Sequence, residues 1–259
     1  MKLPLYQVDA FTSHRFHGNP AAVCPLSEWL EDSILQNIAL ENNLSETAFF
    51  VPQDDSFALR WFTPVIEVEL CGHATLASAH VIYNHLGFQQ LPIKFLSKSG
   101  ELTVTRERER LSLNFPTSTL VKIDPPVEIV AALGRQPLEV YKSRDLLLLY
   151  ESEAEILAIQ PDFEILKHLD CLGIIITAPA DEVDFVSRFF APKVGINEDP
   201  VTGSAHTSLI PYWADKLGKT VLHAYQLSKR RGEIWGEYLG ARVKISGQAV
   251  TYLVGEIEI

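Results

Sequence analysis

The sequence predicts an α+β protein made of two similar domains. The main observation is an internal repeat, in which each half of the chain contains a strand, a proline turn, a glycine and a helix ending in Leu-Gly. The chain has 259 residues, which is enough for two domains of ordinary size. Hydrophobic residues make up 47% of it and charged residues 21%, as expected for a globular protein with a buried core.

The repeat aligns RWFTP with RFFAP and, further along, GHAT with GSAH. Residues recur at spacings of 128 and 131: Arg60, Phe62 and Pro64 match Arg188, Phe190 and Pro192, and Gly72, Ala74, Leu86 and Gly87 match Gly203, Ala205, Leu217 and Gly218. A short insertion between Pro192 and Gly203 accounts for the change of spacing. Matches at two related spacings indicate an internal duplication.

The first half is expected to contain several strands and two helices. Its apolar or alternating segments are residues 3–9, 43–51 after an initial loop, 57–62, and two or three strands within 92–115 around the charged RERER. Residues 16–23 are predicted to form a turn, because Gly-Asn-Pro is a strong turn signal. Ser27 is expected to cap the first helix, and residues 71–85 should form the second helix.

The second half is expected to repeat this mixture. Its predicted elements are a short helix near 127–133, strands at 146–150, 173–178 and 184–190, a helix at 203–217, and strands and turns after that. The segment 116–126 holds three prolines and is the best linker candidate. We therefore expect domains at 1–116 and 117–249, with a last strand at about 250–259 that can complete the first domain.

Charge and composition argue against several classes of function. The formal net charge of -11 disfavours nucleic-acid binding, which a basic patch usually marks. The chain contains no apolar run of the roughly 18 to 20 residues that a membrane helix needs, and its N-terminus lacks the apolar core of a secretory signal. The three cysteines, Cys24, Cys71 and Cys171, are expected to be free thiols in a reducing cytoplasm.

Each copy of the repeat places a glycine at the start of a helix. Gly72-His73 and Gly203-Ser204 are the matched pairs. Glycine lets backbone N–H groups approach a ligand closely, and the free N–H groups of a helix start favour an anion. We therefore expect these starts to bind a small carboxylate. Neither of the two common nucleotide-binding glycine motifs is present.

The sequence ELCGHATLASAH also suggests a metal site or a reactive thiol. Zinc needs three or four ligands, whereas Cys71 and His73 supply two, and the second copy offers only Asp199 and His206 at looser positions. We therefore expect no metal. A helix start can activate a thiol, but Thr202 stands where the second copy would need its cysteine, so a symmetric two-thiol mechanism is unavailable.

Acidic residues near these helix starts are candidates for proton chemistry. Glu46 lies where polar residues enter an apolar strand, a position suited to a general acid or base, although capping is the simpler alternative. Asp199, beside Pro200, can orient an imidazole, bind a substrate amine or cap the helix. Glu198 is expected to be a solvated loop acid, and a histidine such as His73, taken on its own, more often packs or caps a helix.

Together these residues resemble the phenazine-biosynthesis PhzF-like family. The resemblance is carried by VDAFT near residue 8, GNPAAV at 18–23, NLSETAF at 43–49, CGHAT at 71–75 and EDPVTGSA at 198–205. The family shares the fold of diaminopimelate epimerase and proline racemase. The resemblance therefore implies two domains, each a curved, barrel-like, mostly antiparallel sheet around a central helix, with the active site in the cleft between them.

The resemblance also implies a cofactor-independent isomerase, since the best understood relative isomerises trans-2,3-dihydro-3-hydroxyanthranilate without a cofactor or metal. It implies that Glu46 is the general acid/base that moves the proton, assisted by His73 and Asp199. The residues implied to bind a small carboxylate substrate are Asn19, Cys71, Gly72, Gly203 and Ser204. The resemblance further implies a homodimer.

Two alternatives stay open. Cys71 occupies the place of one catalytic cysteine of the epimerases, so an amino-acid epimerase or racemase could use it with another base. A non-catalytic carboxylate-binding protein could also retain the fold. The intact set of candidate catalytic residues argues against the latter, because a binding protein has no evident need for all of them.

Overall fold

The computed structural model describes residues 1–90 and 92–259, and the chain divides into two compact units. Unit 1 consists of Met1–Asn114 with Ser246–Ile259, and unit 2 of Phe115–Ile245. The chain passes from one unit to the other within strands β8 (Arg110–Pro116) and β16 (Arg242–Gly247). Within the described ranges, none of the helices combines the length and the apolar character needed to cross a bilayer.

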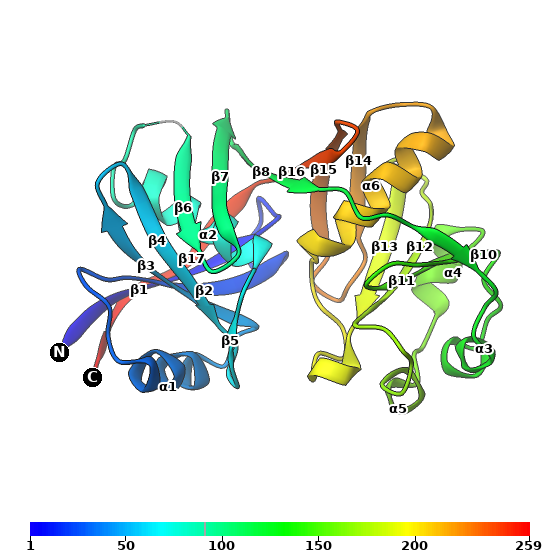
Figure 1. Ribbon diagram of the computed structural model, residues 1–259, viewed down its shortest axis with the longest axis horizontal. Helices are drawn as coiled ribbons and strands as arrows, with labels where there is room; N and C mark the ends of the chain where they lie inside the picture. Colours follow the sequence, from blue (N-terminus) through cyan, green and yellow to red (C-terminus); the bar gives the residue numbers. More distant parts are fainter. Residues whose placement is uncertain (91) are drawn as a thin grey trace. The chain divides into compact units, whose positions relative to one another are not determined.

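Unit 1 is a curved, mostly antiparallel sheet around one helix (Figure 1). Its strands pair in the order β17-β1-β2-β3-β4-β6-β7-β8; the β2–β3 and β4–β6 pairs are parallel and the others antiparallel. The remaining strand bounds are β1 (Lys2–Ala10), β2 (Asn19–Pro25), β3 (Glu46–Gln53), β4 (Ser56–Phe62), β5 (Glu67–Val68), β6 (Ile93–Ser97), β7 (Gly100–Glu107) and β17 (Ala249–Glu258).

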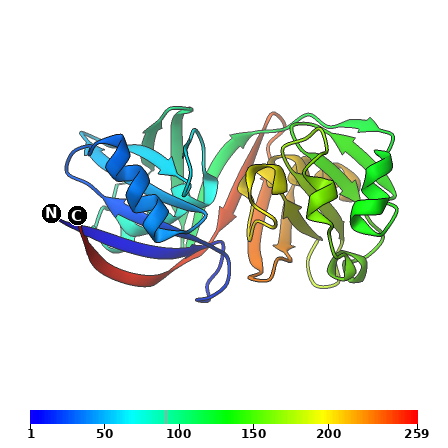
Figure 2. The same cartoon turned by 90° about the horizontal axis from the view of Figure 1, so that it is seen from below.

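The two ends of the chain lie side by side in unit 1. Strands β1 and β17 pair antiparallel, from Lys2 opposite Glu258 to Ala10 opposite Ala249. Figure 2 shows them running together toward the adjacent N- and C-termini. The returning C-terminal strand therefore completes the sheet of unit 1.

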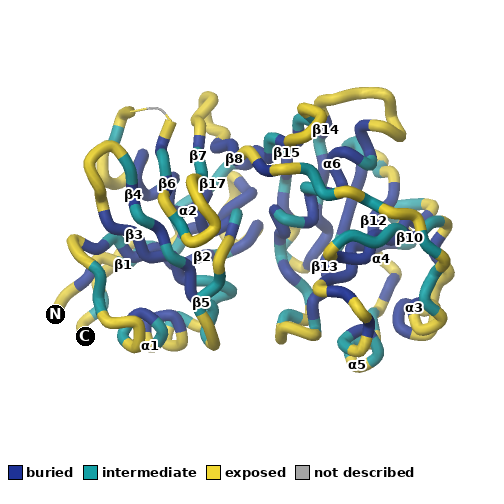
Figure 3. The backbone as a smooth tube through the Cα atoms, viewed as in Figure 1, coloured by how far each residue is buried: buried dark blue, intermediate teal, exposed yellow. Residues whose placement is uncertain are grey.

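Helix α2 (Gly72–Asn84) is the centre of unit 1. The small residues of GHATLASAH let it lie against β1, β2 and β3, and every residue from His73 to Ala79 is buried. A helix that is buried all round needs little polarity on any face. Helix α1 (Asp32–Asn42) differs, because it buries only one side, and Figure 3 shows its exposed outer face.

Unit 2 repeats the arrangement around α6 (Gly203–Leu217), which contacts β14 and β15. On β15, Gly236 leaves room for Ile210 of the helix, since a Cβ atom there would come within 2.5 Å of the Ile210 side chain. The other bounds in unit 2 are β9 (Val121–Ile123), α3 (Val127–Leu133), β10 (Glu139–Lys142), β11 (Leu146–Leu149), α4 (Glu153–Ala158), α5 (Phe163–Leu166), β12 (Ile174–Pro179), β13 (Phe185–Phe190), η1 (Pro192–Val194), β14 (Val221–Gln226) and β15 (Gly232–Tyr238).

An arginine–glutamate pair recurs in each unit ahead of the central helix. Arg60 on β4 donates to both carboxylate oxygens of Glu67, at 2.8 and 2.9 Å. Its equivalent Arg188 on β13 donates to both oxygens of Glu198, at 2.7 and 3.1 Å. Glu198 is thus a paired structural residue and not the solvated acid that the sequence suggested. The pairs tie the strand to the loop that leads into each central helix.

Two turn and cap predictions were wrong. The turn around residues 16–23 ends at Gly18, and β2 starts at Asn19, because Asn19 onward pairs with β1. Ser27 does not cap the first helix. That helix begins only at Asp32, so Ser27 lies too far ahead of it.

The proline-rich segment 116–126 is not a free linker. It contains β9, which pairs with β10, and the whole segment is part of unit 2. The backbone hydrogen bonds of β9 bring it into the sheet despite the prolines on either side. The short helices α4 and α5 lie in a region for which the sequence analysis predicted no element.

Replacing Glu67 by glutamine is expected to lower the free energy of unfolding by about 1 to 3 kcal/mol at pH 7. Hydrogen bonds from Arg60 lower the pKa of the Glu67 carboxyl in the folded protein to about 2. In the unfolded chain the carboxyl takes up a proton near its ordinary pKa of 4.5. The stabilisation is therefore present above about pH 5 and disappears as the pH falls toward 2.

Urea unfolding at pH 7 and at pH 3.5 checks this, with the exposed Glu101→Gln variant on β7 as control. The gap between wild type and Glu67→Gln should shrink at the lower pH. A gap of constant size would contradict the prediction.

Candidate active site

Four of the predicted site residues meet at the start of α2 in unit 1. Glu46 is the first residue of β3, Asn19 the first of β2, and Cys71 precedes α2. Their side chains surround His73: Nε2 of the ring lies 3.2 Å from Glu46 Oε2, and Nδ1 lies 3.5 Å from Cys71 Sγ. Parallel pairing of β2 with β3 places Asn19 and Glu46 at the same end of the sheet.

The imidazole of His73 is neutral at physiological pH. Only 6% of the residue is exposed, and desolvation by burial lowers the pKa of His73 to about 3. Its Nδ1 faces two groups that can donate, the amide Nδ2 of Asn19 at 3.4 Å and the thiol of Cys71. These contacts favour Nδ1 as the acceptor, with the proton on Nε2 on the side of Glu46.

The contact between His73 and Glu46 is close but not aligned as a hydrogen bond. Nε2 and Oε2 are at hydrogen-bonding distance, yet neither atom makes a hydrogen bond of good geometry with the other. Since the ring is neutral, the pair is not a salt bridge either. Glu46 thus lies beside a neutral ring and not beside an imidazolium.

The same residues also have the chemistry of a metal site. One ligand atom each of Glu46, Cys71 and His73 lies within 4.8 Å of the other two, so β3 adds a third ligand that sequence spacing did not reveal. However, the ring turns Nδ1 toward the thiol and Nε2 toward the carboxylate. A single ion binds one nitrogen of a histidine, so these side chains would have to turn before they could share it.

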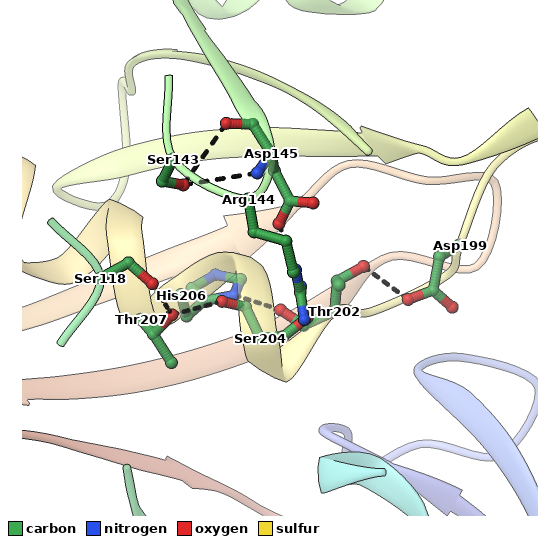
Figure 4. Close-up of polar contacts among 9 residues, drawn as sticks. All are labelled: Ser118, Ser143, Arg144, Asp145, Asp199, Thr202, Ser204, His206 and Thr207. Carbon is green, nitrogen blue, oxygen red and sulfur yellow. Dashed lines mark hydrogen bonds and ion pairs between the residues drawn. The ribbon is translucent and has the colours of Figure 1, made fainter. Parts of the chain in front are cut away.

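A second group of polar side chains lies at the start of α6 in unit 2 (Figure 4). Thr202 donates its hydroxyl to Asp199 Oδ2 at 2.5 Å, and His206 Nδ1 lies 2.8 Å from the Thr202 carbonyl oxygen. Gln226 on β14 accepts from the Thr202 backbone N–H at 2.8 Å and donates to the Asp199 carbonyl at 2.8 Å. The loop that holds Asp199 is therefore fixed on both its side-chain and its backbone atoms.

Both central helices begin without a side-chain cap. Threonine commonly caps a helix, but the Thr202 hydroxyl turns to Asp199 instead, and Cys71 makes no capping bond to α2. In each copy a side chain four residues on contacts the carbonyl of the residue before the helix: Thr75 that of Cys71, and His206 that of Thr202. Gly72 and Gly203 thus begin helices whose preceding residues make no side-chain hydrogen bond to the first turn.

The two copies differ at the position of the carboxylate. Phe62 pairs with Thr47, and its equivalent Phe190 pairs with Ile174, so Glu46 corresponds to Gly173. A Cβ atom on Gly173 would lie 2.2 Å from the Phe189 ring. Unit 2 therefore has no room for a second carboxylate there, and the acid/base candidate belongs to unit 1 alone.

The structure separates the predicted site residues into two sets. Unit 1 holds Asn19, Glu46, Cys71, Gly72 and His73, and unit 2 holds Asp199, Gly203 and Ser204. Sequence reasoning missed Gln226, and it also missed Arg144, whose Nη2 donates to Ser204 Oγ at 3.0 Å. Both come from distant strands or loops, so no local spacing could have indicated them. The roles assigned to all these residues remain predictions.

The comparison with known proteins identifies the family. The phenazine biosynthesis-like family PhzC-PhzF matches residues 8–255. The chain belongs to this family. An uncharacterized isomerase from Pseudomonas aeruginosa is 51% identical over the full length of both chains. The crystal structure of a PhzF-family phenazine biosynthesis protein from Enterococcus faecalis covers 100% of both chains, with 49% identity and a TM-score of 0.98.

The fold likeness extends beyond the family. A predicted epimerase from Pseudomonas aeruginosa is only 18% identical but covers 98% of this chain and 99% of its own, with a TM-score of 0.75. The predicted fold class, the diaminopimelate epimerase type, is thereby confirmed. Relatives that are 48 to 51% identical over nearly the whole chain are named as isomerases, and the protein is an isomerase.

The His73 ring is expected to stay neutral, with its proton on Nε2, from pH 8 down to about pH 4.5. Burial lowers the pKa of His73 to about 3, while the unfolded chain binds a proton near 6.5. For the same reason His73 should lower the free energy of unfolding as the pH falls from 6.5 toward 3.

Ring nitrogen shifts from ¹H–¹⁵N NMR spectra check this, with the His73→Gln variant giving the assignment. The exposed His14 and His17 provide internal comparison. A titration midpoint near 6.5, or a proton on Nδ1, would contradict the account.

Proposed function

We propose that the protein is a cofactor-independent isomerase that shifts a proton on a small carboxylate substrate, with Glu46 as the general acid/base. The observation that carries the proposal is the contact of Glu46 with a neutral imidazole, 3.2 Å away, at the uncapped start of α2. A carboxylate beside a neutral imidazole, rather than paired with an imidazolium, can accept a proton from carbon. Family membership and the isomerase relatives agree with this class of reaction.

The proposed reaction needs no external reactant. Glu46 removes a proton from a carbon next to an unsaturated system, and the electron pair of that C–H bond delocalises into the system. Glu46 then returns the proton to a different carbon, so the product is an isomer of the substrate. The His73 Nε2–H and the N–H groups at the start of α2 stabilise negative charge that develops during the transfer.

Residues of unit 2 are proposed to bind the substrate. Asp199 is fixed by Thr202 and Gln226, so its carboxylate can accept hydrogen bonds from a substrate amine or hydroxyl group. Ser204 and the backbone of Gly203 begin α6 and suit the substrate carboxylate. The proposal thus requires both units to contact one substrate, as the sequence analysis expected.

A second candidate is an epimerase that uses the Cys71 thiol. Cys71 Sγ lies 3.5 Å from His73 Nδ1 and within 4.8 Å of a Glu46 carboxylate oxygen. The thiol and the carboxylate are therefore close enough to serve as two acid/base groups at one substrate carbon. Thr202 at the equivalent position in unit 2 has no such chemistry, so this epimerase would have to work with one thiol.

Replacing Glu46 by glutamine is expected to reduce solvent exchange at a substrate carbon by about 10²- to 10⁴-fold, because the proposed acid/base is lost. Mass spectrometry of deuterium uptake from heavy water measures this on a panel of cyclic carboxylates, including trans-2,3-dihydro-3-hydroxyanthranilate, and amino acids. The exposed Glu101→Gln variant is the matched control. Equal uptake in wild type and Glu46→Gln would overturn the proposal.

Replacing Cys71 by alanine distinguishes the two candidates. Under the Glu46 mechanism, uptake in Cys71→Ala should stay within about tenfold of wild type, since the thiol only neighbours the ring. The epimerase would instead be favoured if wild type takes up deuterium at the α-carbon of an amino acid and Cys71→Ala loses this uptake as completely as Glu46→Gln does.

A further inference from the structure

Arg144 lies at the tip of a rigid hairpin beside the start of α6. Strands β10 and β11 pair up to Lys142 and Leu146, which leaves Ser143, Arg144 and Asp145 as the loop. The loop backbone is fixed: the Ser143 N–H donates to the Asp145 carbonyl at 2.9 Å, and the Leu172 N–H donates to the Arg144 carbonyl at 3.2 Å. A side chain carried by this loop is therefore well placed in space.

The guanidinium of Arg144 is held by one of its nitrogens. Nη2 donates to Ser204 Oγ at 3.0 Å and lies 3.1 Å from Asp145 Oδ2 (Figure 4). The side chain is 54% exposed, and the described part of the chain provides no partner for its other N–H groups. An arginine fork binds carboxylates with two parallel hydrogen bonds, and half of this fork is available.

The position of Arg144 is electrostatically unfavourable by itself. A helix start carries partial positive charge, so a cation beside it is repelled. Asp145 offsets the repulsion, but its side chain is only 3% exposed and its Oδ1 has no hydrogen-bond partner among the described residues. An anion that joins the cation at the start of α6 reduces the repulsion between Arg144 and the helix start.

Unit 1 carries a neutral group at the position that matches Ser204. By the repeat, Ser204 corresponds to His73, and burial keeps the His73 ring neutral. Unit 1 in turn has the Glu46 carboxylate, where unit 2 has Gly173. The duplicated helix starts have therefore diverged, one toward proton transfer and the other toward holding negative charge.

We propose that Arg144 binds the substrate carboxylate together with Ser204, and that Asp145 positions it for this task. The inference rests on the proposed function and adds an orientation to it. The acidic group of the substrate is held by unit 2, and the carbon that exchanges its proton is presented to Glu46. The substrate class is then a carboxylate whose acidic group is separate from the reacting carbon and stays charged throughout.

Binding of benzoate and of its uncharged amide, benzamide, by isothermal titration calorimetry tests the proposal. Wild type should prefer benzoate, and Arg144→Gln should bind benzoate about 10- to 100-fold more weakly while binding of benzamide stays within about twofold. Arg144→Lys should bind benzoate with an affinity between those of wild type and Arg144→Gln, because lysine keeps the positive charge but lacks the forked guanidinium. The control is Arg135→Gln, which removes an exposed arginine paired with Glu155 in the same unit.

Two results of the calorimetry would contradict the proposal. Equal benzoate affinity in wild type and Arg144→Gln, or a wild type that does not distinguish benzoate from benzamide, would overturn the proposal. A general folding defect in Arg144→Gln would weaken binding of benzoate and benzamide alike and lower the melting temperature. That result would also count against a specific role for Arg144. Glu46→Gln should bind benzoate normally, so failure of the proton-transfer mechanism is recognised separately from failure of this anchor.

Discussion

The neutral state of His73 is the condition on which the rest of the site depends. A charged imidazole would hold the Glu46 carboxylate in a salt bridge and make it a poor base. Burial of α2 inside the sheet of unit 1 prevents this, because desolvation removes the charge from the ring. The small residues along α2 allow such deep burial, so the helix packing and the neutral ring have one cause.

The two units share the same loop and helix-start architecture and differ in the side chains placed on it. The pairs Arg60–Glu67 and Arg188–Glu198 brace the same loop in each unit, and both central helices start uncapped. On this common frame unit 1 carries the proposed acid/base Glu46, whereas the packing of Phe189 against Gly173 denies unit 2 the same carboxylate. The two matched helix starts therefore differ in chemistry.

The sequence predicted most of the parts that depend on local chemistry. Glycine at a helix start, the apolar strand after Glu46 and the repeat itself are visible in short windows, and they led to the α2 cluster. Gln226 and Arg144 were missed because they reach Thr202 and Ser204 from 24 and 60 residues away. The linker prediction failed for a similar reason, since pairing of β9 with β10 outweighed the prolines.

The most direct test of the account is a double-mutant cycle of Glu46→Asp and Arg144→Gln, followed by steady-state kinetics on a carboxylate found to exchange deuterium. Glu46→Asp should lower kcat at nearly constant KM, and Arg144→Gln should raise KM at nearly constant kcat. The effects on kcat/KM should multiply to within about threefold, because the two residues act on different parts of the substrate. If Arg144→Gln lowers kcat instead, or the double variant is no worse than the more impaired single variant, then anchoring and proton transfer are not the separate functions described here.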